Sequence, residues 1–115
     1  MLNKKEILKN RVAVSKINKS MVVIFKALSD VNRYRIFYIL IEHPELSVST
    51  LAHILNISLP LTSQHIKVLE HAGLLQKQRV GKRIFTKLEH DDPLAQCIIK
   101  TTKCIIKITK ASYKK

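Results

Sequence analysis

The sequence predicts a mainly α-helical domain that carries one small β-hairpin. Three observations predict this fold class. Apolar residues recur at helical spacing in residues 2–71, the spacing changes to that of strands in residues 74–88, and helical spacing returns after residue 93. Because a chain of 115 residues has room for one modest hydrophobic core, we expect a single domain over residues 1–115.

The first two predicted helices lie in residues 2–28 and 31–41. In the first, the apolar face is clearest from Ile17 onward, and residues 1–15 either continue the helix or form a frayed basic arm. Asp30 is a favourable N-cap for the second helix. That helix ends before His43, because the residue before a proline is disfavoured in helical geometry.

Two shorter helices follow, with a tight turn between them. The third predicted helix covers residues 49–55, and residues 56–58 form the turn. Ser58 is a favourable N-cap for the fourth helix, which runs to about residue 71. Gly73 lies just beyond its end, where a left-handed backbone conformation is common and glycine adopts it without strain.

The C-terminal part changes from strands to a last helix. Residues 74–79 and 83–88 are predicted as two strands, joined by a turn that contains Gly81. Asp92 and Pro93 are typical of an N-cap and a first helical position, so we expect a helix over residues 94–112. Its apolar stripe comprises Leu94, Cys97, Ile98, Thr101, Cys104, Ile105 and Ile108.

This order of elements is that of a winged helix-turn-helix, in which the second of two short helices enters the major groove of DNA. The predicted fourth helix has an apolar side for packing and an opposite side without carboxylates. Hydroxyl and amide groups on that side can bond base edges, and an ammonium group suits a phosphate. The packing side comprises Thr62, Ile66 and Leu69, and the opposite side comprises Pro60, Ser63, Gln64 and Lys67.

The charge balance indicates a polyanionic partner. The chain has 21 Lys and Arg against 8 Asp and Glu, a formal net charge of +13. Residues 1–20 hold six basic residues against Glu6 alone, and residues 94–115 hold six against no acid, which leaves a net charge of +2 for residues 21–93.

In the hairpin, the positions of the basic residues are therefore more informative than their number. A basic hairpin would lie along phosphates or reach the minor groove, and the alternative is an exposed hairpin that happens to be basic. Within seven residues the hairpin carries Lys77, Arg79, Lys82 and Arg83.

From Phe25 to Leu88 the chain resembles the ArsR/SmtB family of metal- and stress-responsive repressors. The matching stretches are FKALSD at residues 25–30 with Arg33, Arg35 and Ile36 after it, ELSVSTL at 45–51, SQHIKVL at 63–69, AGLL at 72–75, and the Gly81 hairpin. The resemblance implies a transcriptional repressor that forms a homodimer through its first and last helices. It also implies binding to an inverted-repeat operator in double-stranded DNA, with two recognition helices in successive major grooves.

The resemblance further implies which residues touch DNA. Leu59 and Leu61 stand where many relatives have polar residues, so thymine-methyl contacts or DNA shape would contribute more to specificity here. Together with Ser58 and Lys67, the expected contacts are Leu59, Pro60, Ser63 and Gln64 in the helix and Arg79, Lys82 and Arg83 in the wing.

The family's metal-sensing positions are mostly not filled by metal ligands in this chain. The thiolate motif on the third helix is Ser-Val-Ser at residues 47–49, and hydroxyls are poor ligands for soft metals. Of the zinc positions, His90 and Asp92 could coordinate, whereas Lys103 and Ile106 could not. His90 and Asp92 are more simply a loop residue and a helix cap, so we expect no metal and no other cofactor.

Cys97 and Cys104 lie seven residues apart on the face that the resemblance assigns to the dimer seam. On an intact helix their Cα atoms are about 10.5 Å apart, beyond the ~7 Å that a disulfide tolerates. An intrachain disulfide is therefore excluded. The two residues are either small buried side chains in the seam or thiols that sense an oxidant, a sulfur species or a metalloid between subunits.

Other function classes find less support. The five histidines are scattered, the chain has no glycine-rich phosphate loop, and no paired carboxylates lie on one inferred wall, so we expect neither an enzyme nor a small-molecule substrate. No apolar run approaches the ~20 residues of a membrane span, and no signal-like segment precedes the first helix, so a cytoplasmic location is expected. The alternative function is a winged-helix module that binds protein or RNA partners without operator specificity.

Overall fold

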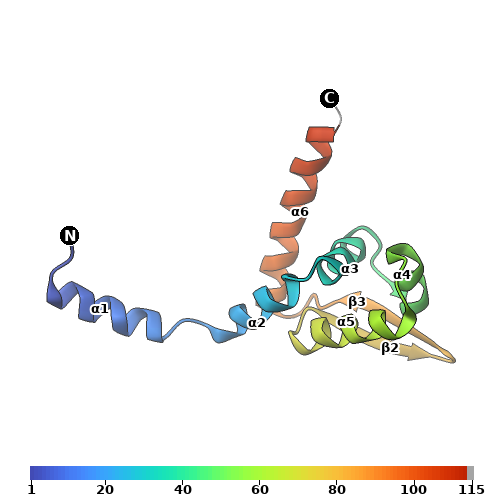
Figure 1. Ribbon diagram of the computed structural model, residues 1–115, viewed down its shortest axis with the longest axis horizontal. Coiled ribbons are helices and arrows are strands. Elements are labelled where there is room, and N and C mark those ends of the chain that lie inside the picture. Colours follow the sequence, from blue (N-terminus) through green and yellow to red (C-terminus); the bar gives the residue numbers. More distant parts are fainter. Residues whose placement is uncertain (114–115) are drawn as a thin grey trace.

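The computed structural model describes residues 1–113, and it confirms a mainly helical fold with a small antiparallel β-hairpin. In Figure 1, α2 to α5 and the hairpin form the body of the protein, while α1 and the far part of α6 project from it in different directions. The elements are α1 (Lys4–Ser15), α2 (Lys19–Leu28), α3 (Val31–Glu42), β1 (Leu46–Ser47), α4 (Val48–Leu55), α5 (Leu59–His71), β2 (Leu75–Val80), β3 (Arg83–Leu88) and α6 (Pro93–Tyr113).

The N-terminal region holds two helices where the sequence predicted one. Asn18 is the N-cap of α2, with an extended backbone and a side-chain oxygen that accepts a hydrogen bond from Ser20 N at 2.9 Å. An extended residue cannot continue a helix, so the helix is interrupted between Ser15 and Lys19. Residues 4–15 are therefore neither a continuation of α2 nor a frayed arm. They form a separate helix, and every residue from 1 to 20 is exposed.

The hydrophobic core lies between α3, α4, α5 and the sheet. From α3, Ile36, Phe37 and Leu40 are almost completely buried in it. The core continues through Leu51 of α4 and Leu69 of α5. Together these contacts fix α5 on the body of the domain and leave its other side free.

The sheet has three strands in the order β1-β3-β2, all antiparallel. The predicted hairpin is confirmed with Val80 opposite Arg83, and Gly81 in its turn has a φ of +62°. The sequence did not predict β1, because a strand of two residues is too short to show alternation. The buried Thr86 hydroxyl holds β1 in place by donating to the Leu46 carbonyl at 2.8 Å.

Helix α6 has three faces. Ala95, Ile99, Thr102 and Ile106 are buried within the protomer, where α6 packs on α3. A second face carries lysines, one of which, Lys110, forms an ion pair with Glu42 of α3. The hydrogen bond to Glu42 raises the Lys110 pKa. The third face is the stripe predicted from the sequence, of which Cys97, Thr101, Cys104, Ile105 and Ile108 are exposed.

Within the described residues, no helix combines the length and the apolar character needed to cross a membrane.

The Asp30 cap leads to a stability prediction. Asp30 Oδ2 accepts a hydrogen bond from Arg33 N at 3.1 Å, and this hydrogen bond lowers the Asp30 pKa from its ordinary value of 3.8. We expect Asp30→Ala to lower the free energy of unfolding by about 1 kcal/mol at pH 7, the usual value of an N-cap. Because the folded-state pKa is lowered, the ionised carboxylate stabilises the protein above pH 3.8, and this contribution fades as the pH falls below that value.

The measurement is urea unfolding at pH 7 and near pH 3. Asp30→Asn is the matched control, because asparagine keeps the accepting oxygen without the charge and should lose much less stability than alanine. Equal losses for the two variants would show that the cap is not the cause.

Candidate nucleic-acid interface

The turn between α4 and α5 is set by local capping. Asn56 ends α4 in the left-handed region with a φ of 54°, which asparagine tolerates better than most residues. Its N–H donates to the His53 carbonyl, and the Ile57 N–H donates to the Ala52 carbonyl, both at 3.2 Å. Ser58 then starts α5, since its hydroxyl oxygen accepts from Leu61 N at 3.2 Å. The predicted turn and N-cap are confirmed.

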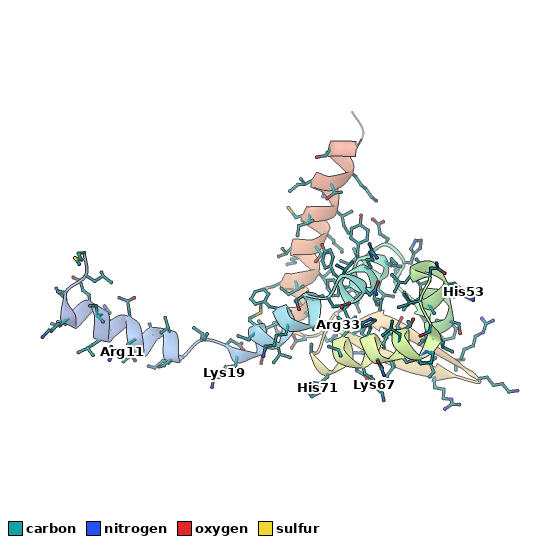
Figure 2. All side chains as sticks on the ribbon, in the orientation of Figure 1. Arg11, Lys19, Arg33, His53, Lys67 and His71 are labelled. Atoms are coloured by element: carbon teal, nitrogen blue, oxygen red, sulfur yellow. The ribbon has the colours of Figure 1, made fainter. Side chains whose placement is uncertain are left out.

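Helix α5 has the two sides that the sequence predicted. Thr62, Ile66 and Leu69 are completely buried, and the Thr62 hydroxyl donates to the Ser58 carbonyl at 2.9 Å. On the other side, Gln64 and Lys67 are exposed, and Figure 2 shows Lys67 pointing away from the body of the domain. The rest of this outer face consists of exposed Pro60 and half-buried Ser63, with Leu59 49% exposed beside them at the N-terminus.

A polar contact that the sequence did not reveal ties α5 to α2 and α3. His65 is buried on the inner side of α5, with its Nδ1 atom 3.5 Å from the Arg33 guanidinium and its Nε2 atom 3.9 Å from Asp30 Oδ2. Arg33 in turn donates from Nε to the Ala27 carbonyl at 2.6 Å. The contact orients α5 against the end of α2 and the start of α3. His65 falls on the predicted packing side, but its partner lies 32 positions away and leaves no local signal.

Of the four basic side chains at residues 77–83 of the hairpin, three lie in solvent without an acidic partner. Arg79, Lys82 and Arg83 are exposed, and within residues 1–113 none of them forms an ion pair. Lys77 differs, because its ammonium group lies 3.3 Å from a carboxylate oxygen of Glu70 near the end of α5. We therefore expect Lys77 to contribute less than the other three residues to the affinity for a polyanion.

The hairpin and α5 meet at one shallow groove of about 150 Å³, called here the α5–wing groove. Leu59 and Ser63 line it from α5, and Lys82 and Arg83 line it from the hairpin. Half-buried Ser63 therefore faces this groove and not the core, and the hairpin lies beside the outer face of α5 without burying Gln64. Hydroxyl and cationic donors at one groove can serve base edges and phosphates at the same time.

Comparison with known proteins identifies this unit. A sequence profile described as "Bacterial regulatory protein, arsR family" matches residues 30–77, which run from the Asp30 cap through all of α4 and α5 into β2. Residues 30–77 of this chain match the arsR family. The resemblance predicted from the sequence is thereby confirmed.

Individual relatives agree with this assignment. The arsenic resistance transcriptional regulator ArsR1 of Pseudomonas putida is 34% identical over 71 residues, which cover 62% of this chain and 56% of that protein. The chain thus spans little more than half the length of that curated relative. HlyU from Vibrio cholerae has a similar structure, with a TM-score of 0.66, 27% identity, and coverage of 75% of this chain and 90% of HlyU.

A third structure supports the winged helix-turn-helix fold alone. The homodimeric DNA-binding domain of a possible ArsR-family regulator from Mycobacterium bovis superimposes with a TM-score of 0.62 at 19% identity. The superposition covers 99% of this chain and 92% of the M. bovis chain.

Of the other residues considered as sensor positions, Cys97, Cys104 and Asp92 do not line the α5–wing groove, whereas Ser47 does. Cys97 and Cys104 are free and exposed on α6. Asp92 is the N-cap of α6, since its Oδ2 atom accepts from Ala95 N at 2.9 Å. Ser47 likewise caps α4 by accepting from Thr50 N at 3.1 Å. Within one protomer and the described residues, no three His, Cys, Asp or Glu side chains gather as metal ligands.

Proposed function

We propose that this protein is a transcriptional repressor that binds an inverted-repeat operator in double-stranded DNA as a homodimer. One observation carries the proposal, namely that the two sides of α5 differ. Its inner side is buried in the core, and its outer face offers hydroxyl, amide and ammonium groups. The N-terminal half of α5 has no carboxylate. Glu70, two turns beyond Ser63, is paired with Lys77. A helix of this kind fits the major groove.

The proposed DNA contacts divide by chemistry. Ser63 and Gln64 bond base edges, and Leu59 contacts thymine methyl groups. Cations bind phosphates and set the register of the protein on the duplex. The full set of proposed contacts is Ser58, Leu59, Pro60, Ser63, Gln64 and Lys67 in α5 and its cap, with Arg79, Lys82 and Arg83 in the wing.

The proposed homodimer forms through α6 and the N-terminal helices. The M. bovis domain is described as homodimeric. In this chain Ile105 and Ile108 stay 43% and 63% exposed on one face of α6, and such exposed apolar faces mark association surfaces. As a regulator rather than an enzyme, the protein would act in the cytoplasm and need no cofactor to bind DNA. Cys97 and Cys104 are the thiols through which an effector would act at this seam.

Selection of bound duplexes from a random DNA pool tests the proposal. We expect one inverted repeat to be enriched, with an affinity at least ~10³ above that for random duplex. Repeating the selection with oxidant, persulfide, arsenite or zinc tests for an effector. Binding without sequence preference, or tighter binding to RNA of the same length, would favour the alternative of a winged-helix module without operator specificity.

The wing gives a second test within the same site. Lys82→Ala with Arg83→Ala should weaken binding to all duplexes alike and reduce the slope of log K against log salt by about one unit for each lost phosphate contact. Lys77→Ala is the control for the single variant Lys82→Ala, because the Lys77 ammonium group is already paired with Glu70. Lys77→Ala should therefore change the salt slope less than Lys82→Ala does. Equal slopes for these two lysine variants would contradict the assignment of Lys82 to the DNA.

A further inference from the structure

A second groove, between α2 and α5, shares only Lys67 with the contacts assigned above. It has a volume of about 360 Å³, and within the described chain no carboxylate lines it. Lys26 of α2 and Lys67 and His71 of α5 stand at its edges. None of the ion pairs of residues 1–113 involves these three residues, so their nitrogen atoms are available to a ligand.

Part of the lining of this α2–α5 groove is apolar. Val23, Ala27 and Val68 form that part, and the two valines remain 44% and 40% exposed. A ligand that fits such a groove has anionic groups for the basic side chains and a less polar part for the valines. The sugar-phosphate backbone of DNA has both, because deoxyribose rings alternate with phosphates.

Arg33 also lines the groove but is already engaged. Its Nε atom donates to the Ala27 carbonyl, and its Nη1 atom lies 3.5 Å from His65 Nδ1. Arg33 therefore adds positive charge to the groove and fixes its two walls, while Lys26, Lys67 and His71 supply the free donors.

The groove continues the outer face of α5. Lys67 belongs both to that face and to the groove, and His71 lies four residues after Lys67 and seven after Gln64, on the same side of the helix. In Figure 2 the labelled Lys67 and His71 point in the same direction from α5. Because the N-terminal residues of a recognition helix contact the bases, its later turns leave the major groove close to the phosphates.

We propose that the α2–α5 groove binds the sugar-phosphate backbone of the operator beside each half-site, through Lys26 and His71 together with Lys67. The proposal rests on the proposed function, since it extends the same DNA-binding surface onto α2. It assigns to α2 a direct contact with DNA that neither the recognition helix nor the wing provides.

Lys26→Gln and His71→Gln, singly and together, test this proposal, with Lys103→Gln on the lysine face of α6 as the control. The probes are the selected operator and a random duplex of the same length, titrated at several salt concentrations. We expect Lys26→Gln to flatten the log K against log salt slope by about one unit for each phosphate that loses its cation. The double variant should weaken both duplexes by the same factor and keep the operator preference, whereas Lys103→Gln should match the wild type.

Ethylation of single phosphates locates the contact. We expect modified phosphates next to each half-site to hinder wild-type binding and to have no effect on the double variant. The rival explanation is that Lys26 and His71 only offset the partial negative charge at the ends of α2 and α5. Variants that unfold at a lower temperature but keep the wild-type affinity and slope would establish that explanation and overturn the proposal.

Wild-type selectivity separates this proposal from the previous one. If the wild type prefers no sequence, the proposed repressor function fails. If the wild type is selective but Lys26→Gln leaves the slope and the phosphate footprint unchanged, only the α2–α5 contact fails.

Discussion

In the Ser63→Ala, Gln64→Ala double variant, the preference for the operator over random duplex should fall from ~10³ or more to near 1. Good side-chain contacts to a base discriminate by about 1–3 kcal/mol each, and a homodimer loses four such side chains at once. Both residues lie on the outer face of α5, so the fold should be unaffected. The electrostatic part of binding remains, because Lys67 and the wing cations are still present.

Competition titrations with operator and random duplexes measure this effect. Ser15→Ala combined with Gln96→Ala is the matched control, since it removes the same two side-chain types from exposed positions of α1 and α6. A double variant at Ser63 and Gln64 that discriminates as well as the wild type would show that another surface reads the bases.

Ile105→Glu with Ile108→Glu should separate the proposed homodimer into monomers and reduce the operator affinity by roughly 10²–10⁴. The two isoleucines lie on the exposed apolar face of α6, away from its buried face. Two carboxylates per protomer at a self-associating surface would be buried without partners and would repel their copies. In a dimer, binding of one half-site holds the second subunit close to the other half-site. Monomers lose this high effective concentration, which accounts for the size of the loss in operator affinity.

Sedimentation of the free protein and titration of the full and half operators measure the two effects separately. Lys103→Ala with Lys107→Ala changes the net charge by the same amount on the lysine face of α6 and should leave the dimer intact. If the double glutamate variant still sediments as a dimer, the seam lies elsewhere.

Much of the fold could be predicted because its boundaries depend on local chemistry. Asp30, Ser58 and Asp92 each accept a hydrogen bond from a backbone N–H three residues ahead, and Gly73 adopts a φ of +78° after α5. Such features act within one turn of chain, so the sequence shows them directly.

The break at Asn18 was not predicted, because apolar spacing continues across it from Val14 to Met21 and hides the cap. The packing and outer sides of α5 were predicted from their spacing, but two features near it were not. The His65–Arg33 contact joins residues 32 positions apart, and the α2–α5 groove forms only once the two helices pack together. The dimer seam was inferred from the resemblance, and a single protomer shows only that this face of α6 is uncovered.

Helix α1 depends on more than its own sequence. It has 12 residues, none of them buried, and an isolated helix of that length is barely stable in water. Since the proposed homodimer includes the N-terminal helices, the order of α1 should vary with the fraction of the protein that is dimeric. At concentrations where subunits separate, residues 4–15 would be the first to unwind and the first to be cut by a protease. The amount of intact N-terminus would then report on the assembly state of the protein.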